Sequence, residues 1–253
     1  MLHVDPARAH ESARALTVGI ARSPSEVREA QRLRWRVFAD EMGAHLQSPE
    51  PGVDQDLVDP YCDHLVVRDE RSGEVVGTYR LLRGIRARRL GGFYADEEFD
   101  LTRLQHLRER CVEIGRSCVH PGYRTGATIA LLWSGIIDYV QRHGCDHVLG
   151  CASVGMADGG HAAASLYNQL SHTSLSPIEY RVFPRCALPL EHLDRDRVAP
   201  VPPLVRGYLR CGAWVCGEPA WDPDFHVADL LMLLPLSRLD ARMARHFMKH
   251  APS

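Results

Sequence analysis

The residues best suited to chemistry are Glu113 and Arg116, which lie three positions apart in a predicted strand over 111–119. A Pro-Gly-Tyr-Arg turn at 121–124 follows this strand and opens directly onto an amphipathic helix. The first backbone N–H groups of such a helix have no partner within it, so they bind phosphate well. An acidic strand beside a phosphate site is the arrangement expected of an enzyme that transfers acyl groups from a phosphate-bearing donor.

Glu113 is the predicted base of this pair. Its strand otherwise carries mainly apolar and small residues, and burial among them raises a carboxyl pKa toward the range of a useful base. The alternative is an ion pair between Glu113 and Arg116. Residues i and i+3 of a regular strand face opposite sides of the sheet, so this ion pair requires a bulge, which Gly115 would permit.

Length and composition predict one large globular domain, because the 253 residues are 45% apolar and 25% charged. The formal net charge of -2 gives no reason to expect nucleic acid as a partner. No stretch reaches the roughly 18 apolar residues of a membrane span, and the N-terminus lacks an apolar signal core, so we expect a cytoplasmic protein. The eight cysteines lack CxxC spacing and the fourteen histidines lack metal-site spacing, so we predict neither a metal nor disulfides.

Hydrophobic periodicity, caps and turns predict the elements that position these residues. Ser23 caps a first helix that runs to about Asp40, and Gly144 ends the helix that follows the phosphate turn. Strands are predicted over 63–68, 75–82, 111–119, 146–152, 179–188 and 225–234, and further helices over 162–170, to about 209, and over 237–249. The pattern indicates an α/β fold with a flexible lead-in over 1–20 and a single domain over 21–253, of which 175–253 is the C-terminal part.

Three sequence segments, taken in order, resemble the GNAT superfamily. They are RWRVFADEMG at 34–43, DHLVV at 63–67 with VVGTYRL at 75–81, and EIGRSCV at 113–119. Within the superfamily the chain is most similar to the branch of ornithine-lipid N-acyltransferases (the hemolysin-like group), which also holds acyl-homoserine lactone synthases and N-acyl amino acid synthases. The resemblance covers about 25–170 and continues through 203–209 and 228–233. It implies a GNAT-like mixed central sheet flanked by helices, with a C-terminal extension.

The resemblance also implies an activity. An N-acyltransferase of this branch moves a (3-hydroxy)fatty acyl group from acyl carrier protein to the α-amine of an amino acid, here most simply ornithine, which gives a lyso-ornithine lipid. Glu113 and Arg116 are then the catalytic residues, and the amine attacks the thioester directly without an acyl-enzyme. The alternatives are an acyl-homoserine lactone or other N-acyl amino acid synthase, and a non-catalytic module that binds an acyl carrier or lipid.

An amino-acid acceptor with a cationic side chain requires a carboxylate for that side chain and an arginine for its own carboxylate. The expected substrate-binding residues are Arg34, Glu41, Asp63, His64, Ser153 and Asp229. Four of them have an ordinary structural alternative. Arg34 and Glu41 also fit a solvated helix face, Ser153 fits a turn cap, and Asp229 fits the edge of a strand.

The phosphate loop departs from that of acetyl-CoA-dependent relatives, which carry an Arg/Gln-x-x-Gly-x-Gly/Ala pattern. Here RTGAT at 124–128 keeps the arginine and one glycine, at a different offset. A single phosphate suits this loop better than a pyrophosphate, so we expect the phosphopantetheine arm of acyl carrier protein rather than acyl-CoA, with no permanently bound cofactor. The expected phosphopantetheine-binding residues are Ser117, Val119, Arg124, Gly126 and Ala127. The alternative for Arg124 is a plain surface arginine at a helix start.

Two basic regions bear on partners. Arginines at 83, 86, 88 and 89, with those at 103, 108 and 110, form a candidate docking surface for an acidic carrier protein, or a solvated face. The predicted helix over 237–249 carries an apolar stripe bordered by basic residues. Such a helix lies on an anionic membrane surface, here the inner face of the cytoplasmic membrane, or docks its stripe on the sheet.

Overall fold

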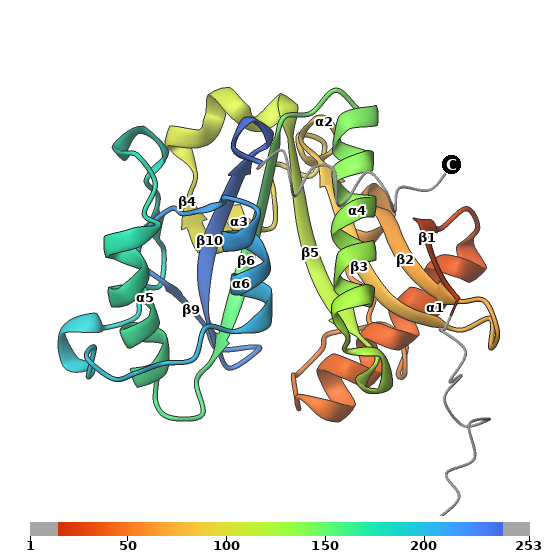
Figure 1. The fold of residues 1–253 in the computed structure, drawn as a ribbon, viewed down its shortest axis with the longest axis horizontal. Coiled ribbons are helices and arrows are strands. Elements are labelled where there is room, and N and C mark those ends of the chain that lie inside the picture. Colours follow the sequence, from red (N-terminus) through yellow and green to blue (C-terminus); the bar gives the residue numbers. More distant parts are fainter. Residues whose placement is uncertain (1–14, 240–253) are drawn as a thin grey trace, which may run out of the picture.

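The computed structural model describes residues 15–239, and its centre is one twisted sheet (Figure 1). The strand order is β1-β2-β3-β5-β6-β10-β8, and β9 also pairs with β10. Every pair of neighbours is antiparallel except β5 and β6, which are parallel. The strands are β1 (Leu16–Ile20), β2 (Asp63–Asp69), β3 (Val75–Arg83), β5 (Cys111–Val119), β6 (His147–Gly155), β8 (Trp214–Val215), β9 (Ala220–Asp222) and β10 (Val227–Pro235), while β4 (Phe99–Asp100) and β7 (Phe183–Pro184) form a separate small sheet.

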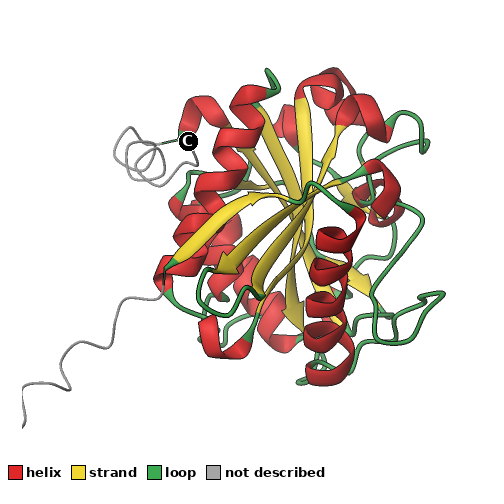
Figure 2. Cartoon of the chain, turned by 90° about the vertical axis from the view of Figure 1, so that its right-hand side faces the viewer, coloured by secondary structure: helices red, strands yellow, loops and turns green. Residues whose placement is uncertain are grey.

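Helices cover both faces of the sheet (Figure 2). The helices are α1 (Pro24–Trp35), α2 (Gly84–Ala87), α3 (Ala95–Glu98), α4 (Gly126–Arg142), α5 (His161–Thr173) and α6 (Pro203–Arg210). Successive side chains of β10 show the two layers: Leu230 and Met232 pack with α4, α5 and α6, whereas Leu231 packs with the α2–α3 region on the opposite face. On that opposite face α1 covers β2 and β3. This arrangement confirms the predicted α/β class with a mixed sheet between helices.

The feature that positions the site is the divergence of β5 and β6. Each strand has nine residues, yet they pair only where Cys111–Glu113 face His147–Leu149. Beyond these positions the strands separate, as the ribbon shows (Figure 1). The facing edges therefore leave backbone N–H and C=O groups without a strand partner, which is costly unless side chains or a ligand occupy the gap.

A β-bulge lies in β5 next to this gap. Thr78 pairs with Cys118 and Arg80 pairs with Gly115, so Tyr79 alone stands opposite Arg116 and Ser117. Arg116 adopts a left-handed backbone conformation, with φ of 48°. A bulge of the kind that a Glu113–Arg116 ion pair would require is therefore present although the two residues do not pair, and its residue with a positive φ is Arg116 rather than Gly115.

Four expectations from the sequence need correction or fall outside the structure. Residues 16–20, expected in the flexible lead-in, form edge strand β1, which the alternation of Leu16, Val18 and Ile20 would have indicated. The strand expected over 179–188 is instead a 3-10 turn, Ile178–Tyr180, followed by the two residues of β7. Only these two residues of the segment pair with β4. The first helix changes to a π-helix at Arg36–Glu41. Most of the helix expected over 237–249 lies outside the described residues.

Candidate active site

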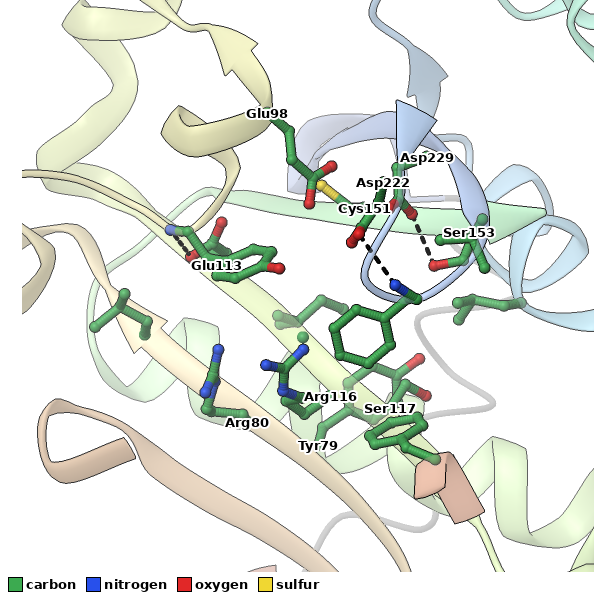
Figure 3. A pocket seen from close by; sticks show the side chains of 18 of the residues that line it. Tyr79, Arg80, Glu98, Glu113, Arg116, Ser117, Cys151, Ser153, Asp222 and Asp229 are labelled. Carbon is green, nitrogen blue, oxygen red and sulfur yellow. Dashed lines mark hydrogen bonds between the residues drawn. The ribbon is translucent and has the colours of Figure 1, made fainter. Parts of the chain in front are cut away.

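A cavity of about 120 Å³ lies where β5 and β6 separate (Figure 3). Its apolar walls include Leu82 on β3, Ile114 on β5, and Leu204 and Tyr208 on α6. Its polar groups come from elements far apart in the sequence and include Arg80, Glu98, Glu113, Arg116, Ser117, Cys151, Ser153, Asp222 and Asp229. The cavity thus combines an apolar wall with charges of both signs, as expected of a site for a small charged substrate and an acyl chain.

Glu113 is held at the inner end of the cavity by the start of α3. Its two carboxylate oxygens accept hydrogen bonds from the backbone N–H groups of Tyr94 and Ala95, each at 2.8 Å. Burial raises the pKa of Glu113 to about 7, against the opposing effect of these hydrogen bonds. A carboxyl with this pKa takes up and releases protons near neutral pH, as a general base must. No ion pair joins it to Arg116 within residues 15–239.

Arg116 is directed by its bulge toward the same face as Glu113. Its guanidinium packs over the rings of Tyr94 and Phe225, with centroid distances of 5.5 and 4.8 Å. Its ion pairs are long, at 3.5 Å to Asp54 and 3.3 Å to Asp56. The Nε atom is buried and has no hydrogen-bond partner among the described residues. A cation positioned in this way retains the capacity to bind an anionic group.

Three carboxylates gather on the opposite wall of the cavity. One oxygen from each of Glu98, Asp222 and Asp229 lies within 4.8 Å of the others. Ser153 donates a hydrogen bond of 2.7 Å to Asp229, and Cys151 bonds to Glu98. Burial and mutual repulsion raise the pKa values of both Glu98 and Asp229. The sequence did not indicate Glu98 or Asp222 as site residues. Glu98 lies in α3, a single turn with no periodicity, and Asp222 has the pattern of a turn residue beside Pro223.

Arg34 lies outside the cavity, fully buried behind Arg116. It donates hydrogen bonds to Asp54 at 2.7 Å and to both oxygens of Asp59 at 2.9 and 2.8 Å. Although burial works the other way, these bonds hold the pKa of Asp59 well below its usual range. Arg80 adds a contact of 3.3 Å to Asp59 and also pairs with Asp56. The acidic loop is therefore neutralised by arginines of this chain, and Arg34 has no free face for a substrate.

The other predicted substrate-binding residues are dispersed. His64 is buried beside Asp59, with its Nε2 atom 3.4 Å from the Asp59 carbonyl oxygen. Asp63 accepts hydrogen bonds from Arg86 at 2.9 Å and from Tyr139 at 2.5 Å. Neither residue lines the cavity. Of the six predicted positions, the structure brings only Ser153 and Asp229 to the cavity with Glu113 and Arg116.

The predicted phosphate-binding residues lie at the outer end of β5. Arg124 donates two hydrogen bonds to Glu41, at 2.6 and 2.7 Å, and one to the carbonyl oxygen of Val119 at 3.2 Å. Gly126 and Ala127 form the first turn of α4, which Thr125 caps. Ser117 lines the cavity, whereas the remaining four do not. Glu41, predicted to bind the acceptor, thus occupies the guanidinium predicted to bind phosphate.

Comparisons with known proteins agree with this geometry. Residues 33–134 match the acetyltransferase (GNAT) domain family. The chain is 38% identical over 251 residues to an L-ornithine N(alpha)-acyltransferase of Rhizobium meliloti, with 92% of this chain and 84% of the relative covered. It is 34% identical over 249 residues to that of Brucella abortus, with 92% and 89% covered. The chain belongs to this acyltransferase family. The predicted assignment to the GNAT superfamily and to its N-acyltransferase branch is confirmed.

Solved structures show that the acyltransferase shares its fold with acyl-homoserine lactone synthases and an N-acyl amino acid synthase. The synthase LasI aligns with a TM-score of 0.52 at 12% identity, over 95% of this chain and 98% of LasI. FeeM, an N-acyl amino acid synthase from uncultured soil microbes, aligns with a TM-score of 0.51 at 13% identity, over 91% and 97%. No helix within residues 15–239 of the acyltransferase is long and apolar enough to cross a membrane.

Proposed function

We propose that the acyltransferase transfers a (3-hydroxy)fatty acyl group from acyl carrier protein to the α-amine of ornithine, forming a lyso-ornithine lipid. The observation that carries this proposal is the 38% identity, over 92% of the chain, to a relative named for N(alpha)-acylation of ornithine. The cavity supports it, since Glu113 and Arg116 meet there beside an apolar wall.

In the proposed reaction the neutral α-amine attacks the thioester carbonyl, and Glu113 accepts the proton that the amine loses. A C–N bond forms, the C–S bond breaks, and the thiolate leaving group takes up a proton. The α-carboxylate of the acceptor pairs with Arg116, which fixes the amine beside Glu113. Cys151 is the cysteine in the cavity, and burial raises its thiol pKa well above the usual value, so it is not a nucleophile at neutral pH.

The donor arm is proposed to lie in the gap between β5 and β6, where extended backbone edges can bond its amides. Ser117 and Val119 flank this path, and Arg124 with the N–H groups of Gly126 and Ala127 holds the phosphate. Because Glu41 forms two hydrogen bonds to Arg124, the phosphate must displace Glu41 or share the guanidinium with it.

The residues outside the cavity are proposed to act through others. Arg34 and His64 hold Asp59, and Asp59 with Asp56 holds Arg80, which lines the cavity together with Arg116. Asp63 is proposed to fix Arg86 in the α2 region. A fault in any of these contacts would disturb the orientation of Arg116 or of α2, without loss of a direct substrate contact.

Carrier-protein docking is proposed for the exposed arginines of the α2 loop. Arg86 pairs with Asp63 and Arg108 pairs with Asp96, so they contribute little free charge. Arg88 pairs with Glu109 at 3.3 Å, but both side chains are highly exposed, and Arg89 is exposed as well, so Arg88 and Arg89 are accessible to an acidic carrier protein. We also propose that the protein is cytoplasmic and makes peripheral contact with an anionic membrane.

The test compares two donors with the same acyl chain. The purified protein is incubated with L-ornithine and either 3-hydroxyacyl carrier protein or 3-hydroxyacyl-CoA, and the products are measured by mass spectrometry. We expect N(alpha)-acyl-ornithine with the carrier-protein donor at a kcat/KM well above that with CoA. Product from CoA alone would overturn the donor assignment. A parallel reaction with S-adenosylmethionine as the acceptor that yields the lactone would overturn the acceptor assignment.

A further inference from the structure

The carboxyl groups of Glu98, Asp222 and Asp229 form an acidic site inside the cavity, and no protein cation among residues 15–239 pairs with it. None of the three forms an ion pair with a residue in the part of the chain that the structure describes. The Oε2 atom of Glu98 is buried and accepts no hydrogen bond there. This contrasts with the acidic loop nearby, where Asp54, Asp56 and Asp59 are each paired with an arginine.

The size of the carboxylate site fits a primary ammonium group. An ammonium has three N–H donors in tetrahedral directions, and charge-assisted hydrogen bonds to carboxylates are about 2.8 Å long. Three acceptors placed in this way lie about 4.6 Å apart by geometry. The three carboxylates each offer an oxygen within 4.8 Å of the others. This upper limit admits a single ammonium that donates one N–H to each of the three carboxylates.

The rest of the cavity matches the remaining groups of a diamino acid. Arg116 and Glu113 line the cavity across from the three carboxylates, which lie together (Figure 3). An acceptor with its carboxylate on Arg116 and its α-amine toward Glu113 would extend its side chain toward Glu98, Asp222 and Asp229. Ser153, which donates to Asp229, fixes that carboxylate in the cavity.

We propose that Glu98, Asp222 and Asp229 bind the side-chain ammonium of the acceptor and set the preference of the enzyme for a cationic amino acid over a neutral one of the same length. The inference rests on the proposed function, because it assumes that the cavity holds an amino-acid acceptor. It adds Glu98 and Asp222 as specificity-determining residues and gives a role to the predicted substrate-binding residue Asp229.

Asp222→Asn is the most informative variant. The Oδ1 atom of Asp222 accepts hydrogen bonds from the backbone N–H groups of Asp224 and Phe225, at 2.9 and 3.1 Å. Asparagine can keep both bonds, so the turn between β9 and β10 is retained while the charge is removed. Asp224→Asn is the matched control, since Asp224 is exposed and lies outside the cavity lining. Glu98→Gln is the second variant.

The experiment measures kcat/KM for L-ornithine and for L-norvaline, which has the same carbon chain without the side-chain amine. We expect Asp222→Asn and Glu98→Gln to lower kcat/KM for ornithine roughly 10- to 100-fold and to leave that for norvaline within about twofold. Asp224→Asn should leave both unchanged. Circular dichroism and Tm confirm that each variant is folded, so that a fall with both acceptors in a folded variant counts against the proposal.

Two results would overturn the inference and are distinct from failure of the proposed function. An unchanged ratio of kcat/KM for ornithine to kcat/KM for norvaline in both variants would show that the carboxylates do not bind the side-chain ammonium. Loss of ornithine acylation on addition of a chelator, restored by Mg²⁺ or Mn²⁺, would assign the site to a metal ion instead. Absence of N-acylation by the unmodified protein with any amino acid would instead refute the proposed function itself.

Discussion

At the scale of single residues, the partners of a buried charged side chain decide whether it remains available for a ligand or serves only the fold. Glu113 is buried and its hydrogen-bond donors are backbone N–H groups, so the pKa of its carboxyl is raised to about 7. Arg34 is equally buried, but it satisfies two aspartates and has nothing left for a ligand. The partners, rather than the residue types, separate these two roles.

The proposed base is tested by Glu113→Gln. We expect kcat to fall roughly 100-fold or more, because a neutral amide cannot accept the amine proton. In the unmodified enzyme kcat/KM should rise with pH and level off above pH 7, because the pKa of Glu113 is raised to about 7. The exposed neighbour Glu97 provides the control, Glu97→Gln, which should retain full activity. A Glu113→Gln enzyme with unchanged kcat and pH profile would exclude Glu113 as the base.

We expect substitution of Arg34 to lower the stability of the fold. Arg34→Met leaves Asp54 and Asp59 buried with only their longer contacts to Arg116 and Arg80, so the free energy of unfolding should fall by about 3–5 kcal/mol in urea denaturation. Arg36→Met, an exposed position just beyond α1, should change it by less than about 0.5 kcal/mol. Unchanged stability with a raised KM for the acceptor would instead identify Arg34 as a substrate ligand.

At the scale of elements, the active site depends on the failure of β5 and β6 to pair along their full length. Gly150 lies just beyond the last pair, Glu113 with Leu149. A Cβ atom there would lie 2.3 Å from the hydroxyl oxygen of Tyr208 and 2.6 Å from the carbonyl oxygen of Ile114. Tyr208 on α6 therefore fills part of the gap and requires a residue without a side chain on β6.

Gly150→Ala is expected to lower the free energy of unfolding by about 1–3 kcal/mol, because the Ile114 carbonyl belongs to the backbone and cannot move aside freely. It should also raise KM for the acyl donor, since β5 or Tyr208 must shift into the cavity. Gly19→Ala in β1 has open space around its Cβ and is the control. Equal urea midpoints for the two variants would contradict this account of the gap.

At the scale of the whole molecule, the buried carboxyls of the cavity reduce stability when they ionise. The pKa values of Glu98, Glu113 and Asp229 are raised, whereas in the unfolded chain such groups have pKa values of about 4. The folded protein therefore holds more protons than the unfolded chain near pH 7, and stability falls as pH rises. His64, whose pKa burial lowers, acts in the opposite direction but only at more acidic pH.

We expect the free energy of unfolding to decrease between pH 7 and pH 8. Asp229→Asn should make this decrease smaller, because it removes one of the ionising groups from the cavity. Urea titrations of both proteins at the two pH values provide the measurement, with Asp224→Asn as the exposed control. Stability that rises over this interval, or an identical slope in Asp229→Asn, would contradict the assignment of these carboxyls.

Strand alternation and helix caps are local properties of the chain, so the sequence by itself determined the α/β class, while its resemblance to GNAT members indicated the superfamily and made Glu113 and Arg116 the candidate catalytic pair. Only the tertiary structure decided what surrounds that pair. Glu98 and Asp222 come from a single helical turn and a hairpin more than 120 positions apart, and neither has local periodicity. The long-range ion pairs of Arg34 likewise leave no pattern in the sequence, since their partners lie 20 and 25 positions away in an irregular loop.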